Sequence, residues 1–251
     1  MSLAPRWRRA IGALAQFVFP RVCASCESAM DDSDQGLVCG RCWSRVPVLR
    51  APRCDRCGHP RPARGACVGC ALLPAFIRAS RAHCWVPSTA SSAILSALKY
   101  DGWPAVADAM GERMARLEWP PDVVAERAAL IPVPLAPEKA RARGYNQADA
   151  LALAVGRRWD VPVWTDVIAR TRATPTQTRL TPGERLANVH RAFALESGAD
   201  ARIRGQHLIL VDDVFTTGAT LNACATVLFD AGARTLSYLT FGRARTSADP
   251  H

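Results

Sequence analysis

Four Cys-x-x-Cys pairs near the start of the chain limit its possible folds more than any other feature. Disulfide frameworks seldom repeat this spacing, whereas zinc knuckles require it, because two thiolates separated by two residues converge on one tetrahedral ion. The pattern therefore predicts zinc binding and, since metal-binding thiols must stay reduced, a cytoplasmic location. The pairs are Cys23/Cys26, Cys39/Cys42, Cys54/Cys57 and Cys67/Cys70.

The order of the pairs predicts two sequential four-cysteine sites. Each interval within a site is long enough for a hairpin that returns the second knuckle to the first. The spacing also allows an interleaved arrangement or a single degenerate site, and His59 is an alternative ligand. An all-cysteine site leaves no open position for water or substrate, so the two zinc ions are predicted to be structural. The predicted sites are Cys23, Cys26, Cys39 and Cys42, then Cys54, Cys57, Cys67 and Cys70.

The chain is basic, with a formal net charge of +10 over 251 residues. Of its 32 basic residues only Lys99 and Lys139 are lysines, which leaves 32 − 2 = 30 arginines. Each zinc ion bound by four thiolates carries a charge of −2, so two sites lower the total to about +6. Charge alone is therefore a weak argument for DNA binding. An apolar content of 49% and a charged content of 22% indicate a folded globular protein.

The N-terminal residues combine three arginines with a short apolar run, 10–19. No small-residue cleavage site follows, and the run is far shorter than the ~20 residues that span a bilayer. A short amphipathic helix that packs on the protein is the expected structure. A membrane-surface helix, which would give peripheral membrane contact, and a cleaved export signal are the alternatives. No later segment is expected to cross a membrane.

Composition divides the chain into an N-terminal helix at 1–21, a double zinc ribbon at 22–74 and an α/β domain at 82–245. In the third part, helical periods alternate with short apolar runs, which predicts a mostly parallel sheet flanked by helices. The segment Pro134–Gly144 is expected to be a basic loop. Expected helices are Ala90–Tyr100, Ala105–Leu117, Tyr145–Trp159 and Thr217–Ala231, and expected strands are Ala82–Val86, Leu130–Val133, Val161–Trp164, Leu208–Val211 and Thr235–Phe241.

The most informative segment runs from Leu208 to Thr220. Its apolar start predicts a buried strand, Asp212 and Asp213 follow at the carboxyl end, and a Thr/Gly turn leads into a helix. Backbone N–H groups, threonine hydroxyls and a helix N-terminus together suit a phosphate dianion. Two adjacent acids fit beside a phosphate only if they face hydroxyl groups or a metal ion. The segment therefore predicts a sugar-phosphate site, with the phosphate at Thr216, Thr217, Gly218, Ala219 and Thr220.

This segment closely resembles the phosphoribosyl pyrophosphate (PRPP) signature of type I phosphoribosyltransferases, with Phe215 at a position where a smaller aliphatic residue is more common. The resemblance implies a parallel-sheet core, Mg²⁺, PRPP as substrate, and a flexible loop that covers the site. Arg143 and Gly144 stand where the pyrophosphate-binding loop belongs. Arg170 and Arg172 stand where the flexible catalytic loop belongs.

The order of these segments resembles the ComF/GntX family, the competence protein F-like proteins, over nearly the whole chain. The resemblance implies a double zinc ribbon before a phosphoribosyltransferase domain, and an association with natural competence, the uptake of single-stranded DNA. An enzyme is the first hypothesis: Asp212, Asp213, Arg170 and Arg172 are its catalytic candidates, and a Mg²⁺-dependent pentosyl transfer from PRPP is its reaction.

A binding module is the second hypothesis. The phosphoribosyl fold would then sense PRPP or hold nucleic-acid phosphates, and the zinc module would contact single-stranded DNA or a DNA-uptake helicase. Trp43, near a zinc knuckle, is the best candidate for stacking on a base. The two unpaired cysteines, Cys84 and Cys224, are predicted to be buried structural thiols.

Overall fold

The computed structural model describes residues 21–31, 34, 36–60, 67–100, 105–171 and 192–245. The expected N-terminal helix, with its alternative of membrane contact, and Arg172 of the expected covering loop lie outside the described residues. Within these segments, none of the helices combines the length and the apolar character needed to span a bilayer.

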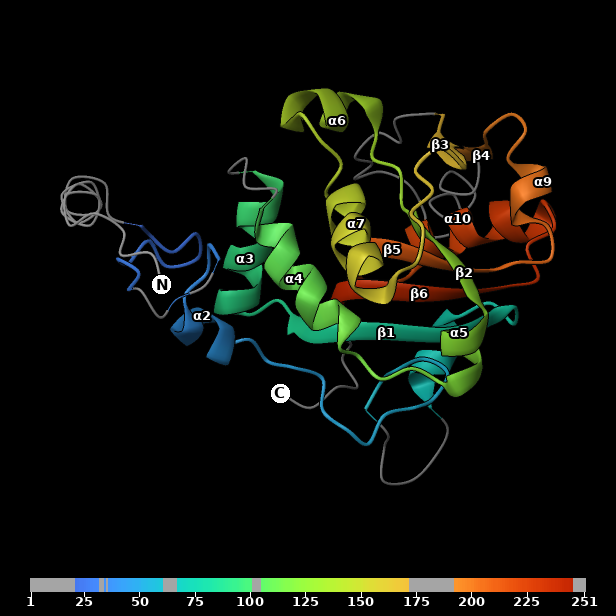
Figure 1. The fold of residues 1–251 in the computed structure, drawn as a ribbon. Coiled ribbons are helices and arrows are strands. Elements are labelled where there is room, and N and C mark those ends of the chain that lie inside the picture. Colours follow the sequence, from blue (N-terminus) through green and yellow to red (C-terminus); the bar gives the residue numbers. More distant parts are fainter. Residues whose placement is uncertain are drawn as a thin grey trace, which may run out of the picture.

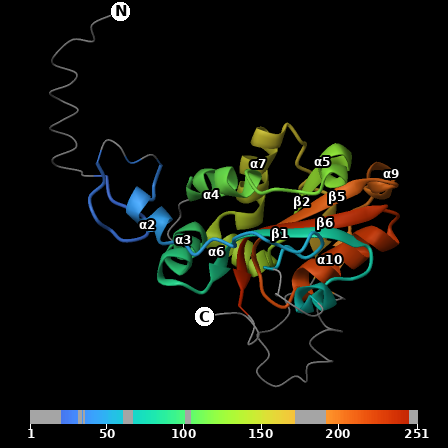
Figure 2. The same ribbon diagram turned by 90° about the horizontal axis from the view of Figure 1, so that it is seen from below.

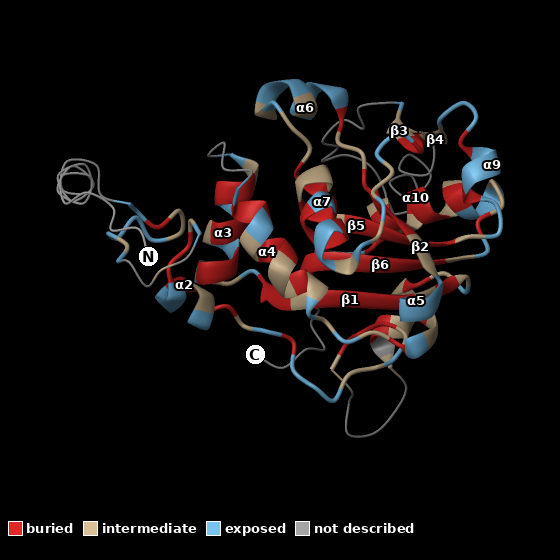
Figure 3. Ribbon diagram, viewed as in Figure 1, coloured by how far each residue is buried: buried red, intermediate tan, exposed pale blue. Residues whose placement is uncertain are grey.

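A four-stranded parallel sheet in the order β1-β6-β5-β2 forms the centre of the fold (Figure 1). The inner strand β6 is buried from Leu236 to Arg243, because helices cover both faces of the sheet (Figure 3). A separate antiparallel pair, β3–β4, lies beside it. The strands are β1 (Ile77–Val86), β2 (Arg127–Pro132), β3 (Ile168–Arg170), β4 (Phe193–Leu195), β5 (His207–Phe215) and β6 (Thr235–Ala244).

Helices cover the sheet on both sides. One core lies between α3, α4, α7 and one face, and the other lies between α10 and the opposite face (Figure 2). Side chains of β5 alternate between the two cores, with Ile209 and Val211 in the first and Leu208 and Leu210 in the second. The helices are α2 (Gly40–Ser44), a 3₁₀ turn η1 (Val68–Leu72), α3 (Thr89–Lys99), α4 (Val106–Ala115), α5 (Pro121–Glu126), α6 (Pro137–Arg143), α7 (Gln147–Trp159), α9 (Asp200–Ile203) and α10 (Ala219–Asp230).

The sequence-based expectation of an α/β fold with a parallel sheet is confirmed. Most of the apolar runs lie in elements of the expected type, but several boundaries differ. β1 begins at Ile77, five residues before the expected start. Val161–Trp164 does not form a strand of the sheet, because only Val163 makes a bridge, to Leu130 of β2.

The segment Pro134–Gly144, expected to be a loop, contains the helix α6. Local signals explain this: Pro137 occupies the first turn, Arg141 and Arg143 lie in the last turn, and Gly144 ends the helix with a φ of 79°. The dense positive charge obscured these start and stop signals in the sequence.

Backbone hydrogen bonds from the cysteine-rich segment cover the open edge of β1. The Leu49 N–H donates to His83 O at 3.0 Å, and the Trp85 N–H donates to Pro47 O at 2.8 Å. Further along the strand, the Ser80 N–H donates to Arg56 O at 2.7 Å. An exposed edge strand invites pairing with other chains, so this cover protects the sheet.

The second cysteine-rich unit is also joined to the interior of the domain. Arg243 of β6 is only 3% exposed and donates from Nη1 to Cys57 O at 2.8 Å. Asn222 of α10 donates to Leu72 O at 3.0 Å. The cysteine-rich module and the sheet therefore share a hydrogen-bond network rather than a simple linker.

These contacts predict unequal effects of removing the two cysteine knuckles. The Cys23→Ala/Cys26→Ala and Cys54→Ala/Cys57→Ala variants should each retain about one zinc ion per chain, because each removes half of one four-cysteine site. The second variant should lose more thermal stability, since residues 56–57 hold β1 and Arg243. Elemental analysis and thermal melts measure both effects. Loss of both ions from either variant would contradict two sequential sites.

Candidate functional site

The eight paired cysteines form two groups. Cys23, Cys26, Cys39 and Cys42 make one, and Cys54, Cys57, Cys67 and Cys70 make the other, with all sulfur atoms of a group within 4.8 Å of one another. The sequential grouping is therefore confirmed. His59 is not a member of the second group; its Nδ1 instead lies 3.0 Å from Pro60 O.

The sulfur spacing fits zinc. Zinc–sulfur bonds of about 2.3 Å in a tetrahedron place the sulfurs about 3.8 Å apart. Cys26 and Cys39 are 3.9 Å apart, and Cys54 and Cys70 are 3.5 Å apart. All ten cysteines are free thiols. Four-sulfur coordination leaves no ligand position open, so these are structural sites.

Hydrogen bonds and burial shift the pKa values of the thiols in the first group in opposite directions. Hydrogen bonds from Ser28 lower the pKa of Cys26 to about 6. Burial raises the pKa of Cys42 to about 12. In addition, the Cys39 N–H donates to the Cys23 sulfur at 3.3 Å. A divalent cation is needed to hold all four thiols in the ionised form.

The second candidate site is a crevice at the carboxyl ends of β2 and β5. The connection after β2 leads through α6 to α7, which packs on one face of the sheet, whereas α10 after β5 packs on the other. Ligands of open α/β sheets bind where neighbouring strands send their connections to opposite faces in this way. The crevice holds a cavity of about 220 Å³ and an adjoining hollow of about 50 Å³, both lined by Asp212 and Thr220.

The two acids lie within β5, which continues to Phe215, rather than after it. Successive strand residues face opposite sides, and Lys99 at the end of α3 forms an ion pair with Asp213, which is 6% exposed. Asp212 accepts the Asp213 N–H at 2.8 Å. Burial and the Asp213 charge raise the pKa of Asp212 well above its ordinary value, although Lys99 opposes the shift.

The turn after β5 forms the 50 Å³ hollow. It is lined by residues that include Thr216, Thr217, Gly218 and Ala219. Gly218 has a φ of 79°, and a side chain there would meet the Phe215 ring at 2.8 Å. The first N–H groups of α10 have no helical partner. The Ala219 N–H donates to the Thr217 hydroxyl oxygen at 3.4 Å, and this end of the helix favours an anion. Both conformation and space therefore require glycine at this position.

Basic side chains form the opposite wall of the cavity. Arg143 and Lys139 reach it from α6, and Arg170 reaches it from the end of β3. Gly144, expected among the pyrophosphate ligands, does not line this cavity. Its N–H donates to Ala140 O at 2.8 Å as the cap of α6.

Sequence analysis missed Lys99 and Tyr100, which line the cavity together with Gln147. A signal for Lys99 was present: it and Lys139 are the two lysines of a chain with 30 arginines (32 − 2), and both lie at this cavity. The compact ammonium group of lysine is not interchangeable with a guanidinium.

The predicted base-stacking role of Trp43 conflicts with its surroundings. The Arg113 guanidinium lies 3.5 Å from the centre of the Trp43 ring, and an edge contact joins Trp43 to Phe241. One ring face is therefore already covered. Cys84 and Cys224 are buried, as predicted.

Comparisons with known proteins found matches to the cysteine-rich module and to the α/β domain. A family model described as a double zinc ribbon domain matches residues 14–71. Competence protein F of Haemophilus influenzae is 30% identical over 229 residues, which cover 89% of this chain and 90% of that protein. The DNA utilization protein YhgH of Salmonella typhi is 31% identical over 232 residues, 86% of this chain and 94% of that protein.

The chain belongs to the competence protein F (ComF) family. This membership confirms the resemblance found in the sequence. Among solved structures, the hypoxanthine phosphoribosyltransferase of Trypanosoma cruzi is similar to this ComF-family chain. The match covers 60% of this chain and 70% of that protein, with 17% identity and a TM-score of 0.35.

The raised pKa of Asp212 predicts a pH-dependent stability. Between the ordinary value of 3.8 and the raised value, the folded chain holds a proton that the unfolded chain has released. The free energy of unfolding therefore falls as pH rises through this window and stays reduced above it. Asp212→Asn, which cannot ionise, should be more stable than the wild type at pH 8. Urea denaturation between pH 6 and 8 measures the difference.

Asp230→Asn, at an exposed position on α10, is the matched control and should change stability little. A variant at Asp212 that is no more stable than this control at pH 8 would contradict a raised pKa of Asp212.

Proposed function

We propose that the chain binds PRPP with Mg²⁺ in the crevice of β2 and β5 and transfers the phosphoribosyl group to an acceptor. One observation carries the proposal: the threonine-lined hollow adjoins the cavity lined by the two acids and the basic side chains, and the two spaces share Asp212 and Thr220. These three surfaces match the phosphate, the ribose and the pyrophosphate of PRPP in order and in charge.

In this proposal each surface has one role. The 5-phosphate binds the turn from Thr216 to Thr220, and the ribose hydroxyls face Asp212 and Asp213. The pyrophosphate lies against Lys139 and Arg143. Arg170 lies at the same wall, and Arg172 is proposed to act from the loop that follows it.

Carboxylate oxygens are suitable ligands for Mg²⁺, and Asp212 and Asp213 would hold the ion with the substrate. When bound, Mg²⁺ supplies charge neutralisation for the pyrophosphate. Lys99 forms an ion pair with Asp213 in the structure and places a positive charge beside this buried carboxylate.

The reaction replaces one bond at the anomeric carbon. The bond from C1 to the pyrophosphate oxygen breaks, and the electron pair leaves with pyrophosphate. The lone pair of the acceptor forms the new bond to C1, and the acceptor then loses its proton. Arg143 and Lys139 stabilise the charge that develops on the leaving group, while the turn fixes the sugar in position.

Ala219→Asp tests the turn directly. Ala219 is the first residue of α10, where aspartate suits a helix N-terminus, so the fold should be retained. The negative charge of the introduced aspartate would repel a phosphate in the hollow. PRPP affinity, measured by calorimetry with Mg²⁺, should fall at least about tenfold, as expected for the loss of a charge-assisted contact.

Ala219→Asn is the matched control, because it has the same shape without the charge, and it should retain most of the affinity. Wild-type protein should also release pyrophosphate from PRPP when its acceptor is supplied. Equal PRPP binding by the aspartate and asparagine variants would exclude the turn as the phosphate site.

A specific surface favours a second candidate function, binding of single-stranded DNA. Helix α6 has no buried residue and carries Lys139, Arg141 and Arg143 (Figure 3). Tyr100 beside it is 74% exposed, and the Arg143 guanidinium lies 5.3 Å from its ring centre. An exposed aromatic ring among cations is typical of surfaces on which bases stack. The relatives named for competence and for DNA utilization agree with this function.

Neutralising α6 tests the second candidate. The variant Lys139→Gln/Arg141→Gln/Arg143→Gln should weaken binding of oligo(dT) and flatten the salt dependence of the affinity. The slope should change by about 0.7 for each DNA phosphate that the variant no longer neutralises. Fluorescence anisotropy at several salt concentrations gives the slope. Arg157→Gln/Arg158→Gln, on the outer end of α7, is a control with a similar change of charge, and an equal effect of both variants would contradict a specific α6 surface.

The remaining parts of the proposal concern location and partners. Two thiol-based zinc sites require reduced cysteines, which supports a cytoplasmic location. A DNA-uptake helicase is the proposed protein partner. The helicase would move the incoming single-stranded DNA, and this chain would bind it.

A further inference from the structure

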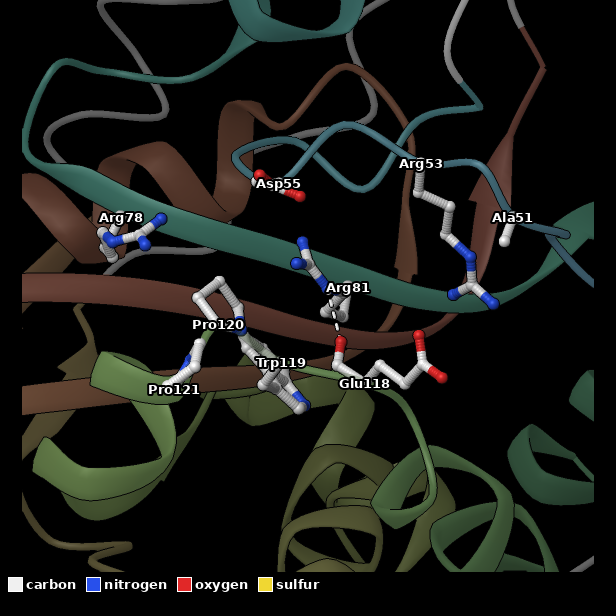
Figure 4. A pocket seen from close by; sticks show the side chains of 9 residues that line it. All are labelled: Ala51, Arg53, Asp55, Arg78, Arg81, Glu118, Trp119, Pro120 and Pro121. Carbon is white, nitrogen blue, oxygen red and sulfur yellow. Dashed lines mark hydrogen bonds between the residues drawn. The ribbon is translucent and has the colours of Figure 1, made fainter.

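A second cavity lies away from the crevice, between the second cysteine group and the outer surface of β1. Its volume is about 350 Å³. We call it the ribbon cavity, and Figure 4 shows its side chains. They come from the segment on both sides of Cys54, from β1 and from the connection between α4 and α5 with the first residue of α5: Ala51, Arg53, Asp55, Arg78, Arg81, Glu118, Trp119, Pro120 and Pro121.

Arg81 is the unusual residue of this cavity. It is 6% exposed, and it forms no ion pair in the described part of the chain, although buried charges are normally paired. Its Nε donates to Glu118 O at 2.8 Å, and its Nη1 donates to Ser80 O at 2.9 Å. A guanidinium has five N–H donors, so three remain for a further acceptor.

Arg53 supplies a second cation without a direct partner. No hydrogen bond or ion pair joins it to another described residue, and it is half-buried. Arg53 and Arg81 therefore place two guanidinium groups in the lining of one cavity.

Arg78 differs from these two arginines although it lines the same cavity. It is bound through two hydrogen bonds, of 2.5 and 2.8 Å, to the carboxylate of Asp122. Arg53 and Arg81 therefore supply the positive charge of the cavity outside an ion pair, and Asp55 adds a carboxylate to the same lining. The Glu118 side chain, near Arg53 in Figure 4, adds a hydrogen-bond acceptor.

This lining selects a ligand of mixed character. Two guanidinium groups suit an anion with several oxygen acceptors, as in a phosphate. The Glu118 carboxylate suits a hydroxyl or amino donor on the same ligand. The Trp119 ring, whose centre lies 5.5 Å from the Arg81 guanidinium carbon, and the two prolines after it offer apolar surface to a ring. The volume is within the range of small-molecule sites.

We propose that the ribbon cavity binds a pentose phosphate unit of nucleotide size, with its phosphate on Arg53 and Arg81 and its hydroxyl or amino groups at Glu118. Such a unit occurs in a free nucleotide and in a strand of nucleic acid. The site is separate from the PRPP crevice and does not depend on the function proposed there.

Calorimetry of the full-length, zinc-loaded chain in the Ala219→Asp background tests the proposal, because this change makes the phosphate turn of the crevice repulsive. dTMP and unphosphorylated (dT)₆ are the two probes. One site per chain should remain for at least one probe, and Arg53→Gln should weaken its binding about tenfold or more. Arg157→Gln, a paired arginine that is 59% exposed, is the charge control and should bind like its parent.

The two probes distinguish the sources of the ligand. Binding of dTMP alone identifies a free nucleotide, and binding of (dT)₆ identifies a strand. Absence of binding by both probes would overturn the proposal, as would equal affinities of the Arg53→Gln and Arg157→Gln proteins. Circular dichroism and zinc content verify that each variant is folded.

Discussion

The pairing of β1 with the cysteine-rich segment is the interaction on which the rest of the structure depends. β1 lies at the edge of a four-stranded parallel sheet, and its outer backbone groups would be open without the bonds to Pro47, Leu49 and Arg56. That segment is short of apolar surface, so a module of this size needs zinc to hold its shape. Zinc binding therefore stabilises the sheet as well as the module, because it fixes the segment that pairs with the edge of β1.

The same connection reaches the phosphate turn. Arg243 binds Cys57 O and lies 4.8 Å from the ring centre of Phe215, whose ring in turn lies under Gly218. Asn222, in the first turn of α10, binds Leu72 O and accepts the Tyr238 hydroxyl at 2.9 Å. The unusual size of Phe215 thus has a structural reason, because a smaller side chain would not span the distance between Arg243 and the turn.

The crevice at β2 and β5 and the ribbon cavity differ in how they arrange charge. In the crevice a buried acid is paired with Lys99, and cations stand on a separate wall. In the ribbon cavity a buried arginine has no acid partner among the described residues, and its donors are left for a ligand. A protein that handles phosphorylated ligands in both places would have two anion sites, one at a helix N-terminus and one built from guanidinium groups.

The sequence by itself determined the zinc sites, the α/β class and the Thr/Gly turn that joins β5 to α10. Each depends on residues close together in the chain: Cys-x-x-Cys spacing, apolar runs of strand length, and the acids followed by threonines and glycine. Only the tertiary structure decided which distant residues meet. Lys99 reaches Asp213 across 114 positions (213 − 99), and Arg81 meets Glu118 and Arg53 from three separate segments. The residue pattern within one segment does not predict such long-range contacts, because the packing of the helices on the sheet determines them.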